Sequence, residues 1–490
     1  MVQSPPRTNP FPGLRPFELD EEHLFFGREG QADELLRRLN RTRFLAVVGT
    51  SGSGKSSLVR AGLLPSLYSG FLPEASSGWR VAILRPGNAP IANLAAALNQ
   101  ADVFGIDPAS DDAIIRTALT ESTLRRGALG LVEVTQQARM EAHESLLVVV
   151  DQFEELFRFK AQAAQKLAAE DEAAAFVKLL LGAVNQRPVP IFVVLTMRSD
   201  FLGDCAQFRD LPEALNDSQY LIPRLTRNQL QKTIEGPIKI AGGKISNNLV
   251  NQLLNEVGDD PDQLPILQHA MMRTWDFWRE TQDEEIDPKH YNAIGSMSQA
   301  LSRHADELFL GSSDSVSTDQ KSNKDRSREQ LIIKVIFDTL TEVNKDRQLI
   351  RRPTSLRDIR KNIEKERINR LAFEKKKMSE YGASYFGIPS YLKSELSLQE
   401  IINQINEFRG SGKSFLMPSE GSLDEDVILD ISHESIIRKW KRLGDWKREE
   451  TIQILRKEII GDSSGKLLPD CLTHLRNPLI SRRRLCPKAP

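Results

Sequence analysis

The chain has 490 residues, which at roughly 150 residues per domain predicts two to four domains. Hydrophobic residues make up 40% and charged residues 27% of it, a composition that argues against wholesale disorder, a collagen-like repeat and a coiled-coil rod. Its 66 basic and 67 acidic side chains leave a formal net charge of -1, which excludes the whole-protein attraction that proteins coating nucleic acids use. Any nucleic-acid binding would have to be local.

Three cysteines, Cys205, Cys471 and Cys486, bear on the cellular compartment. They are too few for a disulfide framework and lack paired metal-ligand spacing, which predicts a reducing compartment, by default the cytoplasm. The start of the sequence has no signal-peptide stretch, and the longest apolar runs, residues 146–150 and 191–195, have the length of strands. No membrane association is expected.

The first predicted region, residues 1–43, contains the proline-punctuated sequence NPFPGLRPF at residues 9–17. Prolines interrupt helices, so no helix is expected before Arg28. Apolar side chains then recur at helical spacing over residues 29–39, which predicts a helix there.

The second region, residues 44–223, alternates short β-branched runs with amphipathic helical stretches. This alternation predicts a parallel sheet covered by helices on both faces. The predicted strands are residues 44–48, 81–84, 146–151 and 191–197.

The sequence GTSGSGKS at residues 49–56 matches the Walker A pattern G-x-x-x-x-G-K-S between a predicted strand and a predicted helix. Its glycines let backbone N–H groups turn toward a phosphate, and the helix N-terminus adds the positive end of its dipole. Lys55 would reach the β and γ phosphates of ATP, and Ser56 would hold Mg²⁺. The alternative is a chance match, which the strand-before, helix-after context disfavours. The predicted nucleotide-binding residues of this loop are Gly49, Thr50, Ser51, Gly52, Ser53, Gly54, Lys55, Ser56 and Ser57.

Acidic residues follow the apolar strand that ends near Asp151. Asp151 is the natural second anchor for Mg²⁺, because phosphate-loop enzymes place a carboxylate at the tip of a neighbouring buried strand. Glu154 and Glu155 come next, and one of them, with a slight preference for Glu155, could polarise the attacking water. The alternative for both glutamates is a solvated helix start, where acids favour the helix dipole.

Arg198 ends the strand predicted at residues 191–197. A guanidinium at the carboxyl edge of the sheet could read the γ-phosphate, because its planar fork matches phosphate oxygens. The alternative is a surface arginine paired with Asp200.

Beyond Pro223 helical periodicity replaces the strands. Residues 224–310 predict a helical lid domain, in which Pro261 and Pro265 mark a turn. Residues 311–329 are rich in Ser and Asp and have the composition of a flexible linker.

The last predicted domain, residues 330–447, begins with helices. It ends with two short strand patterns, at residues 414–418 and 427–431, before a helix that starts at His433. This order predicts a winged-helix-like domain, and residues 448–490 are expected to form a C-terminal tail. The predicted fold class is an α/β P-loop NTPase followed by an α-helical lid domain and a winged-helix domain.

Seven ordered motifs together make the sequence similar to one family. The motifs are NPFPGLRPF, FFGRE at 25–29, the phosphate loop, VVDQFEELF at 149–157, LTMRSDFL at 195–202, DDPDQLPILQHAMMRTW at 259–275 and ISHESIIRKW at 431–440. In this combination the chain resembles the novel STAND NTPase 1 family, whose members are signal-transduction ATPases related to the AAA and NACHT nucleotide switches.

The resemblance implies a switch that is closed with ADP, exchanges it for ATP, oligomerises, and has weak ATPase activity, in signalling or defence. It also implies roles for single residues. Gly27 and Arg28 match the segment that borders the adenine, Pro265 matches a lid proline near the nucleotide, and His433 matches a winged-helix histidine facing the ADP β-phosphate. Without the resemblance, His433 would be read as a helix-start or core histidine. Gln152 replaces the catalytic glutamate of many AAA enzymes, which implies slow hydrolysis.

Partners are inferred from the same resemblance. Many members of the family continue into sensor repeats or begin with an effector domain, and no such segment is recognisable in this sequence. The sensor or effector is therefore expected on another chain, the chain is expected to be a truncated or split form, and a nucleotide-dependent homo-oligomer is expected.

Two other function classes remain as alternatives. An AAA-like ATPase that binds or loads onto DNA, or regulates transcription, is suggested by residues 351–377, which carry eleven basic and four acidic side chains. The other reading of that stretch is a solvated helical face. A scaffold with a degenerate nucleotide site is the second alternative, and the intact Lys55, Ser56 and Asp151 argue against it.

Overall fold

The computed structural model describes residues 8–449 except for short gaps, and the elements and contacts below lie in the compact unit Met1–Trp440. The predicted tail is outside the described residues from residue 450 onward. The gaps are residues 71–77, 108–109, 111, 142, 158–165, 187–189, 259–262, 282, 312–322, 344–348, 382–387, 411 and 420.

A five-stranded parallel sheet forms the centre of the α/β core, in the order β2-β3-β4-β1-β5. Four of its strands coincide with the predicted ones, which confirms the α/β fold class. The fifth, β5, was not predicted because it has three residues and no β-branched side chain. The strands are β1 (Phe44–Gly49), β2 (Gly78–Leu84), β3 (Glu144–Val150), β4 (Ile191–Arg198) and β5 (Gln219–Leu221).

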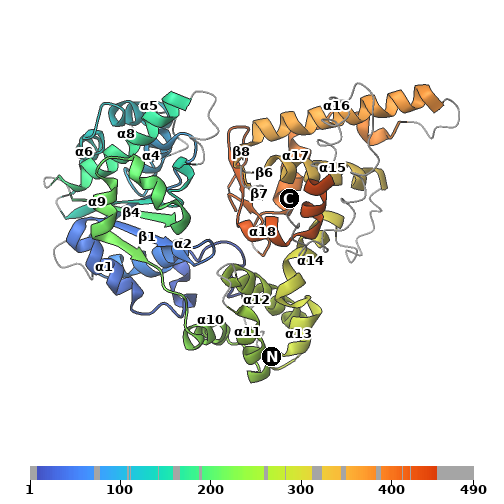
Figure 1. The fold of residues 1–490 in the computed structure, drawn as a ribbon, viewed down its shortest axis with the longest axis horizontal. Helices are drawn as coiled ribbons and strands as arrows, with labels where there is room; N and C mark the ends of the chain where they lie inside the picture. Colours follow the sequence, from blue (N-terminus) through green and yellow to red (C-terminus); the bar gives the residue numbers. More distant parts are fainter. Residues whose placement is uncertain are drawn as a thin grey trace, which may run out of the picture. The chain divides into compact units, whose positions relative to one another are not determined.

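Helices cover both faces of this sheet, as the apolar strands require (Figure 1). Along β1 successive side chains point to opposite faces: Ala46 and Val48 pack with α4, α6 and α8, whereas Leu45 and Val47 pack with α1 and the helical run after the phosphate loop. All four side chains are buried. The covering elements are α1 (Gln31–Thr42), α2 (Lys55–Ser57), the π-helix η2 (Leu58–Leu63), α3 (Leu64–Tyr68), α4 (Pro90–Leu98), α5 (Ala113–Leu124), α6 (Gly130–Gln137), α8 (Lys166–Val184) and α9 (Leu211–Ser218).

The N-terminal segment contains a short helix where none was expected. The 3-10 helix η1 (Leu19–Leu24) begins with a capping box in which Glu18 and Glu21 satisfy each other's backbone N–H groups. Upstream of it, Phe11 is buried in the apolar cluster of the helical segment described next, and Asn9 Nδ2 donates to Met272 O at 2.9 Å. The segment therefore ties distant parts of the chain together despite its prolines.

The described part of residues 224–310, named here the helical segment, contains helices, as the periodicity predicted. Pro265 was expected in a turn between helices, but it lies in the first turn of α12 itself. A helix tolerates proline there, because the N–H that proline lacks would have no intrahelical acceptor. Pro261 lies outside the described residues. The helices are α10 (Arg227–Ile240), α11 (Asn247–Val257), α12 (Gln263–Glu280), α13 (Pro288–Ala293) and α14 (Ser296–Leu310).

The C-terminal segment, residues 323–440, mixes helices with short strands. The two predicted strands are present as β9 and β10, but the sheet β8-β10-β9 and the hairpin β6-β7 contain three strands that were too short to show a period in the sequence. Helix α15 begins at Asn323, inside the stretch predicted as a linker. The elements are α15 (Asn323–Thr339), β6 (Thr341–Val343), β7 (Leu349–Arg351), β8 (Thr354–Ser355), α16 (Leu356–Tyr381), η6 (Ser390–Leu392), α17 (Leu398–Glu407), β9 (Leu416–Met417), β10 (Ile428–Ile431) and α18 (Glu434–Lys439).

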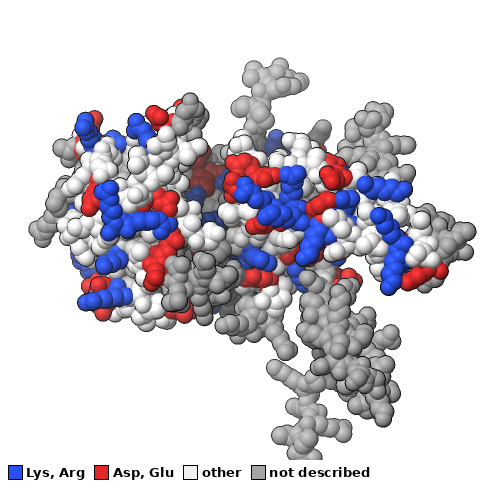
Figure 2. Space-filling view, turned by 90° about the horizontal axis from the view of Figure 1, so that it is seen from above, with Lys and Arg blue, Asp and Glu red and all other residues white. Residues whose placement is uncertain are grey.

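Charge is mixed over the surface. On the face drawn in Figure 2, Lys and Arg side chains are interspersed with Asp and Glu. Among the described residues, no helix combines the length and the apolar character needed to cross a membrane.

Candidate nucleotide site

The phosphate loop connects the end of β1 to a helical run that starts at Lys55. Gly52 (φ +73) and Gly54 (φ +85) have the left-handed backbone that glycine adopts without strain, which turns the chain sharply between strand and helix. The first N–H groups of a helix have no intrahelical acceptor, so the loop offers donors and a positive dipole end to an anion. These features fit a nucleotide phosphate.

One pocket lies at the carboxyl edge of the sheet and collects residues from five regions of the chain. Most of the predicted site residues line it, whereas Gly49, Thr50, Gly27, Asp151 and Glu155 are not among its lining residues. The lining consists of residues 12–17, 24–26 and 28 from the N-terminal segment, 51–57 from the phosphate loop, Arg85, Gln152, Glu154, Thr196 and Arg198 from the sheet edge, Leu225, Thr233, Leu264, Pro265 and Gln268 from the helical segment, and Arg351, Ser432, His433 and Glu434 from the C-terminal segment.

Ser56 and Asp151, the predicted metal ligands, are brought together. Ser56 Oγ donates to Asp151 Oδ1 at 2.7 Å, and Thr196 Oγ1 donates to the same oxygen at 2.6 Å. Burial by itself would raise the pKa of Asp151, but the guanidiniums of Arg60 and Arg85 and the two hydroxyls lower it below its ordinary value. Asp151 is therefore an anionic oxygen donor beside a hydroxyl, a donor set that suits Mg²⁺.

Lys55 lies against the loop that precedes it. Its Nζ donates to Gly49 O at 3.1 Å and to Thr50 O at 2.8 Å. Burial lowers the pKa of Lys55, and the nearby carboxylates of Glu154 and Asp151 oppose that effect. The lysine charge is thus held at the phosphate end of the pocket.

The two glutamates after Asp151 are placed differently, and the slight preference for Glu155 is not supported. Glu155 is buried and its Oε2 accepts from Gly87 N at 3.0 Å, and burial raises its pKa to about 7. Glu154 lines the pocket, and its Oε2 accepts from Arg198 N at 3.3 Å. Of the two glutamates, Glu154 is therefore the one that lines the pocket.

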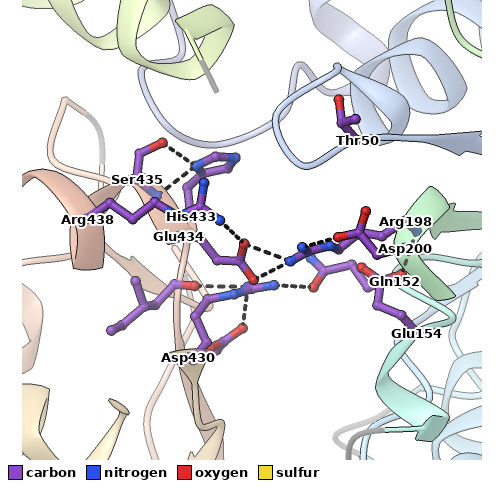
Figure 3. Close-up of polar contacts among 12 residues, drawn as sticks. Thr50, Gln152, Glu154, Arg198, Asp200, Asp430, His433, Glu434, Ser435 and Arg438 are labelled. Carbon is purple, nitrogen blue, oxygen red and sulfur yellow. Dashed lines mark hydrogen bonds and ion pairs between the residues drawn. The ribbon is translucent and has the colours of Figure 1, made fainter. Parts of the chain in front are cut away.

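Arg198 forms ion pairs with two carboxylates, those of Asp200 and Glu434 (Figure 3). Its Nη2 pairs with Asp200 Oδ2 at 2.5 Å, as the structural alternative predicted. Its Nη1 lies 2.7 and 2.8 Å from the two carboxylate oxygens of Glu434, which is buried and lines the pocket. The guanidinium that was expected to bind a γ-phosphate is thus paired with a carboxylate from the C-terminal segment.

Arg351 belongs to the basic stretch 351–377 of the DNA-binding alternative, but it lies inside the pocket. It is 8% exposed and lines the pocket, where Nη1 donates to Asp430 Oδ2 at 2.8 Å and Nη2 donates to Gln152 Oε1 at 2.9 Å. A buried arginine is not available to a duplex. It joins the C-terminal segment to the residue after Asp151.

His433 precedes α18 and lines the pocket. Its Nδ1 accepts from Ser435 N at 3.1 Å, which makes it the N-cap of that helix. Burial, helped by the charge of Arg351, lowers its pKa to about 4. The imidazole is therefore neutral near pH 7, so it can serve as a hydrogen-bonding group toward a ligand but not as a charge.

Of the two residues assigned to the adenine, Arg28 lines the pocket and Gly27 does not. Arg28 donates to Ser53 O at 2.9 Å and to Pro223 O at 2.7 Å, which fixes the phosphate loop to the end of the core. Gly27 (φ +87) allows close packing, because a Cβ there would lie 2.7 Å from Gln229 O. Pro265 lines the pocket, and so do several aromatic and aliphatic side chains, namely Phe17, Leu24, Phe25, Phe26, Leu225 and Leu264.

Five residues of the site were not singled out from the sequence in this role: Arg60, Arg85, Thr196, Arg351 and Glu434. Glu434 could have been found from its position beside His433, and Arg85 from its position directly after a strand. Arg351 gave no such signal, because its partners are distant in the sequence.

A family model for the novel STAND NTPase 1 domain matches residues 10–464. Among solved structures, the Aeropyrum pernix ORC1 protein in complex with DNA is 13% identical, with a TM-score of 0.40 over 86% of this chain and 94% of that one. The A. pernix ORC2 protein with ADPNP and ADP is 13% identical, with a TM-score of 0.38 over 86% of this chain and 95% of that one. A chain of the HORMA:CdnC:Trip13 complex of E. coli MS115-1 is 13% identical, with a TM-score of 0.36 over 57% of this chain and 91% of that one. These values are too low to carry an inference about function.

No curated protein matches the sequence. The family model, however, spans more than half of the chain, including the phosphate loop, the sheet edge and the segment that carries His433 and Glu434. The chain belongs to the novel STAND NTPase 1 family.

Proposed function

We propose that the chain is a nucleotide-controlled switch of STAND type, which binds ADP in a closed state and ATP in an open, oligomerising state, and which hydrolyses ATP slowly. The observation that carries this proposal is the composition of the pocket that contains the phosphate loop. Its walls come from five regions of the chain, so a ligand that fills the pocket can contact all of them at once. A change in the bound nucleotide can then change how these parts hold together.

Magnesium is part of the proposal. Ser56 and Asp151 would hold it, because their oxygens are already adjacent and Mg²⁺ prefers oxygen ligands. The ion would neutralise charge on the phosphates. Lys55, His433 and the loop N–H groups would hold the phosphates themselves.

The ion pair between Arg198 and Glu434 supports a closed state without a γ-phosphate. Both carboxylate oxygens of Glu434 accept hydrogen bonds from one guanidinium nitrogen of Arg198, as two phosphate oxygens could. A γ-phosphate that reached Arg198 would compete with this carboxylate. In the proposed cycle ATP weakens this contact between Arg198 and the C-terminal segment. We assign the C-terminal segment as a winged-helix domain and the helical segment as the lid.

Sensor and effector partners are proposed to reside on another chain. Their engagement would allow exchange of ADP for ATP, followed by homo-oligomerisation in the cytoplasm.

Two measurements on purified protein test this function. Mass analysis of denatured protein is expected to find bound ADP, and light scattering coupled to size exclusion is expected to find a larger species with a slowly hydrolysed ATP analogue and Mg²⁺ than with ADP. Absence of nucleotide together with an unchanged size would contradict the switch. The same column run with the Lys55→Ala protein is the control for nucleotide dependence.

The DNA-binding alternative has less support. Arg351 is buried, and Arg367 is buried against Leu392 O and Glu364, so two members of the basic stretch face inward. Along the exposed part of α16, Lys361 pairs with Asp358 and Arg370 with Glu366. Duplex binding with a steep salt dependence, lost on neutralising Arg352, Lys375, Lys376 and Lys377, would restore this alternative.

A further inference from the structure

Gln152, which lines the pocket, has an unusual backbone conformation. It is a non-glycine residue with φ +61, in the left-handed region that such side chains rarely adopt. Its N–H donates to Thr196 Oγ1 at 2.9 Å, and that hydroxyl donates to Asp151 Oδ1, which also accepts from Ser56. The backbone of Gln152 is thereby fixed to the proposed metal ligands, and its side chain lines the pocket. Strained conformations of this kind persist where the surroundings enforce them, often at functional sites.

The side-chain oxygen of Gln152 is already engaged. Arg351 Nη2 donates to Gln152 Oε1 at 2.9 Å, and Arg351 Nη1 donates to Asp430 Oδ2 at 2.8 Å and to Ile431 O at 3.1 Å. Figure 3 shows Gln152 and Asp430 on opposite sides of this set of contacts. Arg351 therefore connects the end of β3 in the core with β10 in the C-terminal segment.

Gln152 is also the group best suited to orient a water molecule. A glutamine amide offers one acceptor and two donor hydrogens, so it can hold a water in line with a phosphate although it cannot accept a proton as a base. The other candidates fit less well, because Glu155 does not line the pocket and Glu154 Oε2 accepts from the backbone of Arg198. The hydrogen bond from Arg351 takes one of the two acceptor positions of this oxygen and fixes the direction in which it points, so the guanidinium competes with a water for it.

We infer that Gln152 is the catalytic residue that orients the attacking water, and that Arg351 is a positioning residue that occupies its side-chain oxygen and so holds hydrolysis back. This inference rests on the proposed function, because it concerns hydrolysis in the same site. In the step itself the water oxygen forms a bond to the γ-phosphorus while the bond from that phosphorus to the bridging oxygen breaks. The electron pair leaves with ADP, and the water proton passes to a phosphate oxygen. Separation of Arg351 from Gln152 frees the amide oxygen, so movement of the C-terminal segment and hydrolysis are coupled.

A double-mutant cycle of Arg351→Met and Gln152→Leu tests the inference on the full chain. The measured quantity is the single-turnover rate constant of ATP hydrolysis with Mg²⁺, which excludes product release. Arg351→Met is expected to raise it about tenfold, the size of one hydrogen bond to a charged group, with ATP affinity changed about twofold at most. Gln152→Leu is expected to lower it, and Arg351→Met in the Gln152→Leu background is expected to give no increase.

Arg85→Met is the matched control. Arg85 also approaches Asp430, at 3.6 Å from Nη1 to Oδ2, in an ion pair that does not involve Gln152. Loss of this charge reproduces the general loosening around Asp430, so any effect of it is expected to be the same in the wild-type and the Gln152→Leu backgrounds.

Several outcomes would overturn the inference. They are a slower or unchanged rate in Arg351→Met, an equal increase in the Gln152→Leu background, and an unchanged rate in Gln152→Leu alone. The last variant alters only a pocket-lining side chain, so it decides the question even where Arg351→Met fails to fold. Failure of the proposed function looks different, because wild-type protein would then neither retain nucleotide nor hydrolyse ATP.

Discussion

The phosphate loop and the C-terminal segment both supply side chains to the pocket, but they are built in different ways. The loop places its groups within residues 49–57, where each position follows from the strand before it and the helix after it. The C-terminal segment supplies Arg351 from β7 and His433 and Glu434 from the start of α18, so its contribution depends on two sheets and a helix that pack correctly. The first is fixed by local geometry, whereas the second depends on tertiary packing.

The contacts of the two regions differ in chemistry as well. The loop rests on a sheet whose central side chains are apolar and almost fully buried. The contacts between the sheet edge and the C-terminal segment include ion pairs and hydrogen bonds, such as Arg198 with Glu434 and Arg351 with Gln152. Polar contacts between parts of a chain are more readily exchanged than apolar ones, because water or a ligand can replace them. Binding is therefore expected to depend on the loop, and regulation on the C-terminal segment.

The largest effect is expected from the loop itself. Lys55→Ala removes a charge that faces the phosphates and serves no apolar core, so nucleotide affinity is expected to fall at least about 100-fold with the fold retained. Isothermal titration with ADP and ATP measures the affinity, and circular dichroism is the control for the fold. Unchanged affinity would contradict the assignment of the loop.

A second test concerns the contact between the helical and C-terminal segments. His269 and His304 are buried with Nε2 and Nδ1 3.0 Å apart, and both rings lie edge-on to Phe415. Burial, with the charge of Arg273, lowers the pKa of His269 to about 3. Below the ordinary histidine pKa of about 6.5, His269 is protonated in the unfolded chain but not in the folded chain. The free energy of unfolding therefore falls as the pH drops from about 6.5 toward 3.

The expected loss for His269 between pH 7 and pH 5 is about 2 kcal/mol in the free energy of unfolding. Urea denaturation at both pH values, compared between wild type and His269→Asn, measures it. The raised pKa of Glu155 acts in the opposite direction, and the comparison with the variant cancels it. An equal pH dependence in the two proteins would refute this role of His269.

A smaller effect is expected from the ion pair between the regions. Glu434→Gln removes the carboxylate on the pocket side of Arg198, and the ratio of ATP to ADP affinity is expected to rise about tenfold because a γ-phosphate no longer has a competitor. Asp200→Asn is the matched control, since Asp200 binds the same guanidinium but its side chain is 54% exposed and does not line the pocket. Equal ratios in the two variants would mean that Glu434 does not discriminate between the nucleotides.

The smallest effect is expected on the exposed end of α16. Replacement of Lys375, Lys376 and Lys377 by Gln is expected to leave nucleotide affinity and duplex binding unchanged, because these side chains do not line the pocket and oppositely charged residues accompany them. Fluorescence anisotropy with a labelled duplex at several salt concentrations measures duplex binding. A clear loss would move the functional surface from the pocket to this helix.

Much of the core could be predicted from sequence because its signals are local. The strands β1 to β4 are six to eight residues long and each contains an apolar run. The glycines, Lys55 and Ser56 occur at fixed spacing between a strand and a helix. The placement of Asp151 opposite Ser56 followed from a general rule, since carboxyl ends of parallel strands meet at one edge of the sheet. Pro265 in α12 and the helix η1 were missed because capping and first-turn positions tolerate residues that otherwise break helices.

The sequence by itself therefore determined the family, the phosphate loop and the identity of most groups that face a nucleotide. Tertiary structure alone decided which glutamate lines the pocket, that Glu434 binds Arg198, and that Arg351 is buried against Gln152 rather than exposed to DNA. The reason is sequence separation: Arg351 and Gln152 are 199 residues apart, and Arg198 and Glu434 are 236 apart. No local period or motif encodes such a pair, because its geometry arises only when separately folded elements pack together.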